Sequence, residues 1–291
     1  MIGAGAQTVA QALRAAVRQL REAGIPDAPG DARVLLASAM GLGPDRLTLH
    51  LPDPLDPAAE ARLAAHLAAR TARQPVSQIT GRRLFWGMEF IVTPQVLDPR
   101  PETEVLVAQA ISRPFVKLLD LGTGSGAILL ACLRSMPMAT GLGVDLSPDA
   151  LAVARRNAAA LGLERRARLV QSDWFAAVHG RYDLIVSNPP YIAAGELSAL
   201  EPEVRLHEPL MALSPGGDGL GAYRQITAGA LARLMPGGRI LLEIGPTQGA
   251  AVRAMLDAQG FERCTLLPDL DGRDRVVMAY APGGDQGCGS V

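Results

Sequence analysis

The chain has 291 residues, a formal net charge of −1 and 48% hydrophobic residues. This length predicts one large domain and one smaller one, with enough apolar residues for a sizeable core. A protein that grips a nucleic-acid backbone usually carries a basic surplus, and this chain does not. The longest apolar run, residues 127–133, is far shorter than the roughly 18 residues that a membrane helix needs.

The three cysteines, Cys132, Cys264 and Cys288, are odd in number and far apart in the sequence. Their spacing favours neither a disulfide framework nor a zinc site. No apolar segment with a small-residue cleavage site follows the N-terminal arginines, so we expect no signal peptide. We therefore expect a cytoplasmic protein without a membrane partner.

Residues 1–78 are predicted to form a small helical domain. Apolar residues recur at helical spacing over residues 9–20, and a glycine and a proline then end this helix. Two further helices are expected over residues 31–40 and 57–73. Because three short helices form a bundle rather than an α/β layer, this part is expected to be a separate domain.

Residues 79–98 are expected to form a hairpin linker, since two short apolar runs flank Gly87. Strands and helices then alternate through residues 99–281, which predicts an α/β domain with a mostly parallel sheet and helices on both faces. The last two strands have no helix between them, so this pair is expected to be antiparallel. The glycine-rich tail, residues 282–291, is predicted to be disordered.

The expected strands are residues 116–121, 141–144, 168–170, 182–187 and 239–244, then two near Cys264 and Val276. The expected helices are residues 127–136, 148–161, 223–235 and 248–259.

A glycine-rich loop lies between the first of these strands and its helix. It reads Gly122, Thr123, Gly124, Ser125, Gly126. Glycine allows a tight turn and a close approach of ligand to backbone, at the sheet edge where ligands bind in open α/β folds. Asp145, which ends the next strand, is placed to accept hydrogen bonds from ribose hydroxyls. Nicotinamide enzymes and methyltransferases share both features, so the pair predicts a nucleoside-containing cofactor without choosing between them.

Trp174 and its neighbour Asp173 follow the third strand. The carboxylate could accept a hydrogen bond from an adenine amino group, while the indole could cover the purine ring. Ordinary core packing explains Trp174 about equally well from the sequence alone.

The sequence Asn188-Pro189-Pro190-Tyr191 follows the fourth strand directly. Two prolines stiffen the backbone and remove two donors, which leaves carbonyl oxygens to face outward. The Asn188 side chain adds an acceptor. These groups could hold a planar –NH2 group by both hydrogens while Tyr191 stacks on it. Such a clamp suits methyl transfer to nitrogen and has no use in hydride transfer.

The two motifs together resemble class I methyltransferases that act on amide and amino nitrogens. Further segments resemble the HemK/PrmC family of release-factor glutamine N5-methyltransferases over roughly residues 70–280. These are Thr80-Gly81 before Phe85-Trp86, Arg100-Pro101-Glu102-Thr103-Glu104, Gln171-Ser172-Asp173-Trp174-Phe175, and Val204-Arg205 with Glu208-Pro209. Asp98 departs from the pattern, where an apolar residue is expected.

The resemblance implies a Rossmann-like seven-stranded domain that binds S-adenosylmethionine through Gly122 to Gly126, Asp145, Trp174 and Asn188. It also implies that Asn188, Pro189, Pro190 and Tyr191 bind the substrate amide, with Asn188, Pro189 and Tyr191 as the catalytic set. The implied partner is a peptide chain release factor, methylated on the glutamine of its Gly-Gly-Gln loop. The N-terminal helices are then expected to help hold that partner.

Two other functions remain open from the sequence, and a nicotinamide oxidoreductase is a third, more distant one. An adenine-N6 methyltransferase of DNA or RNA would share the clamp, although the missing basic surplus argues against stable nucleic-acid binding. A protein that binds the ribosome or a release factor without catalysis would not need an intact clamp and glycine loop. Glu102 and Glu104 fit either a cofactor contact or a helix N-terminus, and Glu208 could order the loop after the clamp.

Overall fold

The computed structural model describes residues 7–43 and 45–283. The contacts divide the chain into two compact units. The first comprises the chain up to Arg82 together with Glu201–His207, and the second comprises Arg83–Leu200 and the chain from Glu208 onward. Of the tail expected to be disordered, residues 284–291 lie outside the described part of the chain.

The first unit is helical, as the sequence predicts. It contains α1 (Val9–Glu22), α2 (Ala28–Ala39), a 3-10 turn (Leu47–His50), α3 (Pro57–Thr71), α4 (Val76–Thr80) and α8 (Pro202–His207). Thr8 caps α1 in a capping box with Gln11, and Asp27 and Asp56 cap α2 and α3. Each cap satisfies an amide that the first turn of a helix leaves unpaired.

Helix α8 belongs to the first unit although it follows the Asn-Pro-Pro-Tyr segment in sequence. The buried Arg70 guanidinium of α3 links α8 to α2, because it bonds Asp31 of α2 at 2.6 Å and Glu203 of α8 at 2.9 Å. Gln78 also donates to the His207 carbonyl oxygen at 2.9 Å. The polypeptide of the second unit is therefore interrupted by seven residues, Glu201–His207, that pack with the first.

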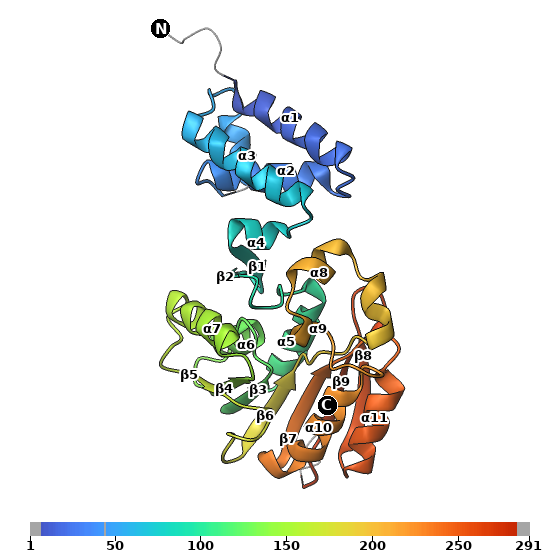
Figure 1. The fold of residues 1–291 in the computed structure, drawn as a ribbon. Coiled ribbons are helices and arrows are strands. Elements are labelled where there is room, and N and C mark those ends of the chain that lie inside the picture. The colour runs from blue at the N-terminus through green and yellow to red at the C-terminus, as the bar shows by residue number, and fades with distance from the viewer. Residues whose placement is uncertain (1–6, 44, 284–291) are drawn as a thin grey trace, which may run out of the picture. The chain divides into compact units, whose positions relative to one another are not determined.

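The second unit is an α/β domain (Figure 1). Its hairpin consists of β1 (Arg82–Phe85), whose first residue belongs to the first unit, and β2 (Met88–Ile91). Its sheet consists of β3 (Lys117–Leu121), β4 (Thr140–Asp145), β5 (Ala167–Gln171), β6 (Tyr182–Ser187), β7 (Leu234–Glu243), β8 (Glu262–Pro268) and β9 (Asp274–Tyr280). Its main helices are α5 (Glu104–Ile111), α6 (Ala127–Ser135), α7 (Pro148–Ala160), α9 (Leu210–Leu213), α10 (Gly221–Ala230) and α11 (Gly249–Ala258).

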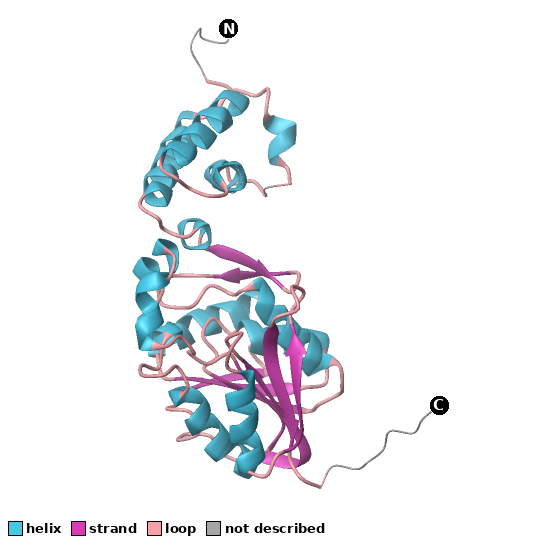
Figure 2. Ribbon diagram, turned by 90° about the vertical axis from the view of Figure 1, so that its right-hand side faces the viewer, coloured by secondary structure: helices cyan, strands magenta, loops and turns pink. Residues whose placement is uncertain are grey.

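The strand order is β5-β4-β3-β6-β7-β9-β8, and the first five strands run parallel. Strand β9 is antiparallel to both β7 and β8, which confirms the seven-stranded fold class and the antiparallel last pair. Side chains alternate between two cores. Leu118 packs with α5 and α6 on one face, whereas Leu119 and Leu121 pack with α10 and α11 on the other. The sheet thus lies between two helical layers (Figure 2).

The sequence misplaces one boundary. A helix was expected over residues 223–235, but α10 ends at Ala230, a 3-10 turn covers Leu231–Arg233, and β7 begins at Leu234. Pro236 explains why the helix does not reach residue 235, since proline disfavours the helical conformation in the residue before it. Leu234 instead pairs with Tyr182 of β6. The short helices α4, α8 and α9 were also not predicted.

Asn157 of α7 ties the hairpin to the glycine-rich loop. The side chain is fully buried. Its oxygen accepts from the Ile91 amide at 2.7 Å, and its nitrogen donates to the Ile91 and Ser125 carbonyl oxygens at 3.1 and 2.8 Å. One side chain therefore satisfies three backbone groups of two segments that are far apart in sequence.

We expect Asn157→Leu to lower the free energy of unfolding by about 3 kcal/mol or more, because each buried polar group left unpaired costs about 1–3 kcal/mol. Urea unfolding measures this, and Arg156→Ala at the exposed neighbouring position is the control. A loss no larger than that of the control would show that these three bonds contribute little.

Candidate active site

The glycine-rich loop leaves the end of β3 and leads into α6. Gly122, Gly124 and Gly126 all adopt positive φ angles, of +68°, +55° and +82°. Such angles suit glycine, since other residues adopt them only with strain. A Cβ atom on Gly124 would meet no protein atom within 4 Å, so the backbone there faces open space. The loop can therefore bring a ligand against its main chain.

Asp145 lies at the end of β4, next to this loop. One carboxylate oxygen accepts from the Gly124 amide at 2.8 Å, and the other accepts from the Ser147 amide at 2.9 Å. Burial raises the pKa of Asp145, while these amides oppose the shift. A carboxylate oxygen can accept more than one hydrogen bond, so each retains acceptor capacity for a ligand hydroxyl.

Asp120 lies beneath the loop and is fully buried. It accepts a 2.6 Å hydrogen bond from the Thr123 hydroxyl, while its other oxygen has no partner in the described part of the chain. Burial raises the pKa of Asp120 to about 7, and the nearby Asp145 charge acts in the same direction. The fold thus holds a carboxyl group that is about half protonated near pH 7.

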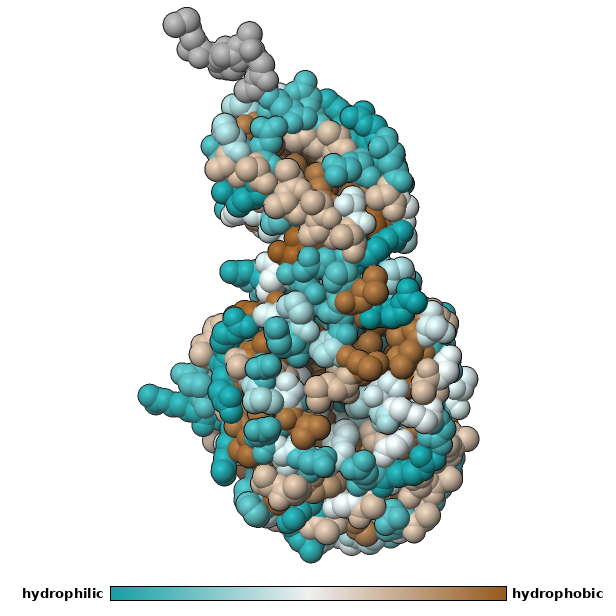
Figure 3. All heavy atoms as spheres, in the orientation of Figure 1, coloured by the Kyte–Doolittle hydropathy of each residue, from teal (hydrophilic) through white to brown (hydrophobic). Residues whose placement is uncertain are grey.

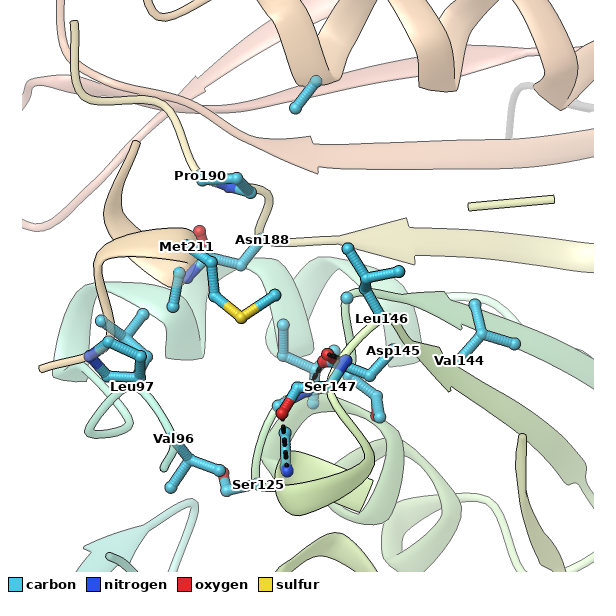
Figure 4. Close-up of a pocket in the computed structure, with 18 of the residues that line it drawn as sticks. Val96, Leu97, Ser125, Val144, Asp145, Leu146, Ser147, Asn188, Pro190 and Met211 are labelled. Carbon is cyan, nitrogen blue, oxygen red and sulfur yellow. Dashed lines mark hydrogen bonds between the residues drawn. The ribbon is translucent and has the colours of Figure 1, made fainter. Parts of the chain in front are cut away.

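A cavity of about 380 Å³ opens beside these groups, within the size range of ligand sites. Of the residues predicted for the site, it is lined by Gly122, Thr123, Gly124, Ser125, Asp145, Trp174, Asn188 and Pro190. Figure 4 shows Asp145 and Ser147 on one side of the cavity and Asn188, Pro190 and Met211 on the other. Gly126, Pro189 and Tyr191 are not among the lining residues.

Asn188 follows β6 directly and is half-buried at the cavity wall. Its side-chain nitrogen donates to the Thr103 hydroxyl at 3.4 Å. The hydrogen bonds found among the described residues engage only this nitrogen, so the Asn188 oxygen remains available as an acceptor. Sequence reasoning did not single out Thr103, since nothing near it in sequence indicates a partner in Asn188.

Tyr191 turns toward the core rather than lining the cavity. It packs with the apolar cluster around α10 and α11, and its carbonyl oxygen accepts from Gln248 at 2.8 Å. Burial raises the pKa of the Tyr191 phenol to about 12. Stacking of Tyr191 on a substrate amide stays a prediction.

The three glutamates left open by the sequence occupy different places. Glu104 accepts from the Trp86 amide at 2.7 Å, which joins α5 to the hairpin turn. Buried Glu208 pairs with Arg100 at 2.6 Å, and burial raises its pKa to about 7. The Glu102 side chain is exposed, on the turn that precedes α5.

Several cavity residues were not predicted. Residues 95–100, Leu146, Ser147 and Met211 line it, and Met211 and Leu146 remain half exposed. The unexpected Asp98 is buried and lies 3.7 Å from the Arg83 guanidinium, which gives the buried carboxylate a charged partner.

On the face drawn in Figure 3, apolar residues occur in small groups among hydrophilic ones.

Across the described residues, no helix is both long and apolar enough to cross a membrane. That same part of the chain contains no group of three or more His, Cys, Asp or Glu side chains able to hold a metal ion.

Comparison with known proteins identifies the family. The PrmC N-terminal domain family matches residues 11–81, and the methyltransferase small domain family matches residues 97–219. A release factor glutamine methyltransferase of Cereibacter sphaeroides is 63% identical over 273 residues, which cover 94% of this chain and 98% of that protein. The chain belongs to the release factor glutamine methyltransferase family.

Other members of this family are also similar. That of Caulobacter vibrioides is 44% identical over 93% of this chain and 96% of its own length, and that of Agrobacterium fabrum is 41% identical over 95% and 99%. Two solved structures share the fold at low identity. A Pyrococcus furiosus methyltransferase has a TM-score of 0.54 at 18% identity, covering 74% of this chain and 99% of that one. The catalytic domain of hMettl16 has a TM-score of 0.57 at 17% identity, covering 79% and 83%.

We expect Asp145→Ala to weaken S-adenosylmethionine binding about ten- to a hundred-fold, because a hydrogen bond to a charged group contributes about 1.5–3 kcal/mol. Calorimetric titration measures the affinity. Asp183→Ala is the matched control, since Asp183 also accepts two backbone hydrogen bonds, at 2.9 and 2.8 Å, but does not line the cavity. Equal affinities of the two variants would contradict the assignment of Asp145.

The raised pKa of Asp120 makes a prediction about stability. Folding favours the protonated form, so its stabilising contribution is fully present below the unfolded pKa of 3.8 and is lost as pH rises through about 7. Asp120→Asn keeps an acceptor for Thr123 but does not titrate. Between pH 5 and 7, wild type should lose about 2–3 kcal/mol relative to this variant. Parallel stability curves for the two proteins would show that Asp120 keeps an ordinary pKa.

Proposed function

We propose that this protein transfers a methyl group from S-adenosylmethionine to the side-chain amide nitrogen, N5, of the glutamine in the Gly-Gly-Gln loop of peptide chain release factors. The observation that carries the proposal is the meeting of Gly122, Asp145 and Asn188 at one cavity, in a chain of this family. The first unit, which the PrmC N-terminal domain family matches, would help hold the release factor.

The cavity fits the cofactor by its chemistry. Gly124 offers exposed main chain, and the Asp145 carboxylate retains acceptor capacity for the ribose hydroxyls. Trp174 and Asp173 line the same cavity, where they could contact the adenine. When bound there, S-adenosylmethionine supplies an electrophilic methyl group.

The task of the protein is to orient a poor nucleophile, because the lone pair of an amide nitrogen is delocalised into its carbonyl. Asn188 presents a side-chain oxygen at the cavity wall, and the Pro189 carbonyl lies in the backbone between two lining residues, Asn188 and Pro190. Two acceptors at this wall can hold both amide hydrogens and orient the nitrogen. Their hydrogen bonds strengthen as the nitrogen becomes positive, which lowers the barrier. The proton then leaves to water.

Adenine offers the same planar –NH2 group, so nucleic acid is the alternative substrate. The similarity of this chain to release factor glutamine methyltransferases and its formal net charge of −1 favour the protein substrate. A label-transfer experiment decides between them. The protein is incubated with radiolabelled S-adenosylmethionine and equimolar release factor, duplex DNA and RNA. The label should enter the release factor, whereas label in nucleic acid would overturn the proposal.

Asn188→Ala should lower kcat on a release factor about 100-fold or more, because an interaction that strengthens in the transition state is lost. Asn188→Asp should retain more activity than Asn188→Ala, since aspartate keeps an acceptor oxygen on a side chain of the same size. KM for the release factor should change little, because the wider docking surface is intact. A kcat of Asn188→Ala within twofold of wild type would refute this role of the side chain.

A further inference from the structure

Two buried side chains lie behind Asn188 without a part in the mechanism above. Thr103 is 4% exposed, on the turn before α5, and Glu243 is 1% exposed, at the end of β7. The Thr103 hydroxyl lies within hydrogen-bonding reach of the Glu243 carboxyl group, where it acts to lower the pKa of that group, and it accepts from the Asn188 side-chain nitrogen at 3.4 Å. The three side chains therefore form a line from the core to the cavity wall.

The chemistry of this line gives it a direction. When Glu243 is ionised its carboxylate can only accept, so Thr103 then donates its single hydroxyl proton to Glu243. The Thr103 oxygen can then only accept from Asn188, which it does from the amide nitrogen. The Asn188 nitrogen is thereby held toward the core, and its oxygen is left for the cavity.

Neither side chain is accounted for by helix capping or ion pairing. Thr103 occupies the N-cap position of α5, yet its side chain makes no capping hydrogen bond. Glu243 has no ion pair within 4 Å among the described residues, and its second carboxyl oxygen has no hydrogen-bond partner there. Burying a carboxyl group so incompletely paired costs stability, which points to a role beyond folding.

The surroundings hold Glu243 firmly in this place. The Tyr223 hydroxyl donates to the Glu243 carbonyl oxygen at 2.8 Å, and Glu243 is paired with Val276 of β9 in the sheet. Burial raises the pKa of Glu243 to about 7 and Glu102 acts in the same direction, whereas Thr103, Arg275 and Arg100 favour the ionised form. The carboxyl group is thus fixed in position behind Thr103.

We propose that Thr103 and Glu243 are positioning residues that hold the Asn188 amide with its oxygen toward the substrate. The inference rests on the proposed function, because it concerns the acceptor that would bind the glutamine amide. We call Glu243, Thr103 and Asn188 together the relay. Without it, the Asn188 amide can rotate and place its own –NH2 group against that of the substrate, where neither can accept.

Thr103→Val tests the relay, because it removes the hydroxyl and keeps the shape. We expect kcat on a release factor to fall about tenfold or more, as for other losses of orientation, with KM changed less than twofold. Thr103→Ser, which keeps the hydroxyl, should restore kcat to within about threefold of wild type. Thr227→Val is the control, since Thr227 is also buried but lies on α10 away from Asn188.

Cofactor affinity separates the relay from a direct contact, because Thr103 also lines the cavity. Calorimetry should give S-adenosylmethionine dissociation constants for Thr103→Val and wild type within about threefold. An unchanged kcat, or a loss confined to cofactor affinity, would overturn the relay. So would failure of Thr103→Ser to restore kcat.

A double-mutant cycle extends the test to Glu243. Glu243→Met keeps an extended side chain without an acceptor, so it should lower kcat as Thr103→Val does. Because both substitutions break one relay, the double variant should be no slower than the slower single variant. Multiplication of the two losses would show independent roles. If Glu243→Met fails to fold, the comparison of Thr103→Val with Thr103→Ser still decides whether the hydroxyl matters.

The failure of this inference is distinguishable from the failure of the proposed function. If wild type transfers no methyl group to a release factor, the proposed function fails. If wild type is active and Thr103→Val keeps its full kcat, only the relay fails.

Discussion

The register of three parallel strands determines the site. Leu121 of β3 lies opposite Val144 of β4 and Ser187 of β6. The next residue along each strand is therefore at the same level, and these are Gly122, Asp145 and Asn188. A glycine loop, a carboxylate and an amide from distant parts of the sequence thus meet at one edge of the sheet. A shift of one residue in either pairing would turn the side chains to the opposite face.

Three buried carboxyl groups lie close to residues of the cavity, and burying them costs folding free energy. Burial raises the pKa values of Asp120, Glu208 and Glu243 each to about 7. Each has one carboxyl oxygen without a hydrogen-bond partner in the described part of the chain. Incompletely paired buried carboxyls are unfavourable, and perturbed pKa values of this kind concentrate at functional sites. Each is close to a cavity residue: Asp120 to Thr123, Glu208 to Arg100, and Glu243 to Thr103.

Most of the fold and the centre of the site follow from local sequence. Neighbouring residues in the sequence predict the strand ends, the glycine loop and the Asn-Pro-Pro-Tyr segment. The parallel strands then bring their carboxyl ends together. The partners behind the site do not follow in this way. Nothing near Thr103 indicates Glu243 or Asn188, because their proximity exists only once β6, β7 and the turn before α5 are assembled. The grouping of α8 with the helices has the same origin, since Arg70 and Glu203 are 133 residues apart.

The central claim is that this edge presents a glutamine amide to the methyl donor. Mass spectrometry of a release factor after reaction with this protein and S-adenosylmethionine tests it most directly. The account predicts a mass gain of one CH2 group on the Gly-Gly-Gln peptide, with fragment ions that place it on the glutamine side chain. An unmodified glutamine, or a methyl group on a different residue, would contradict the account.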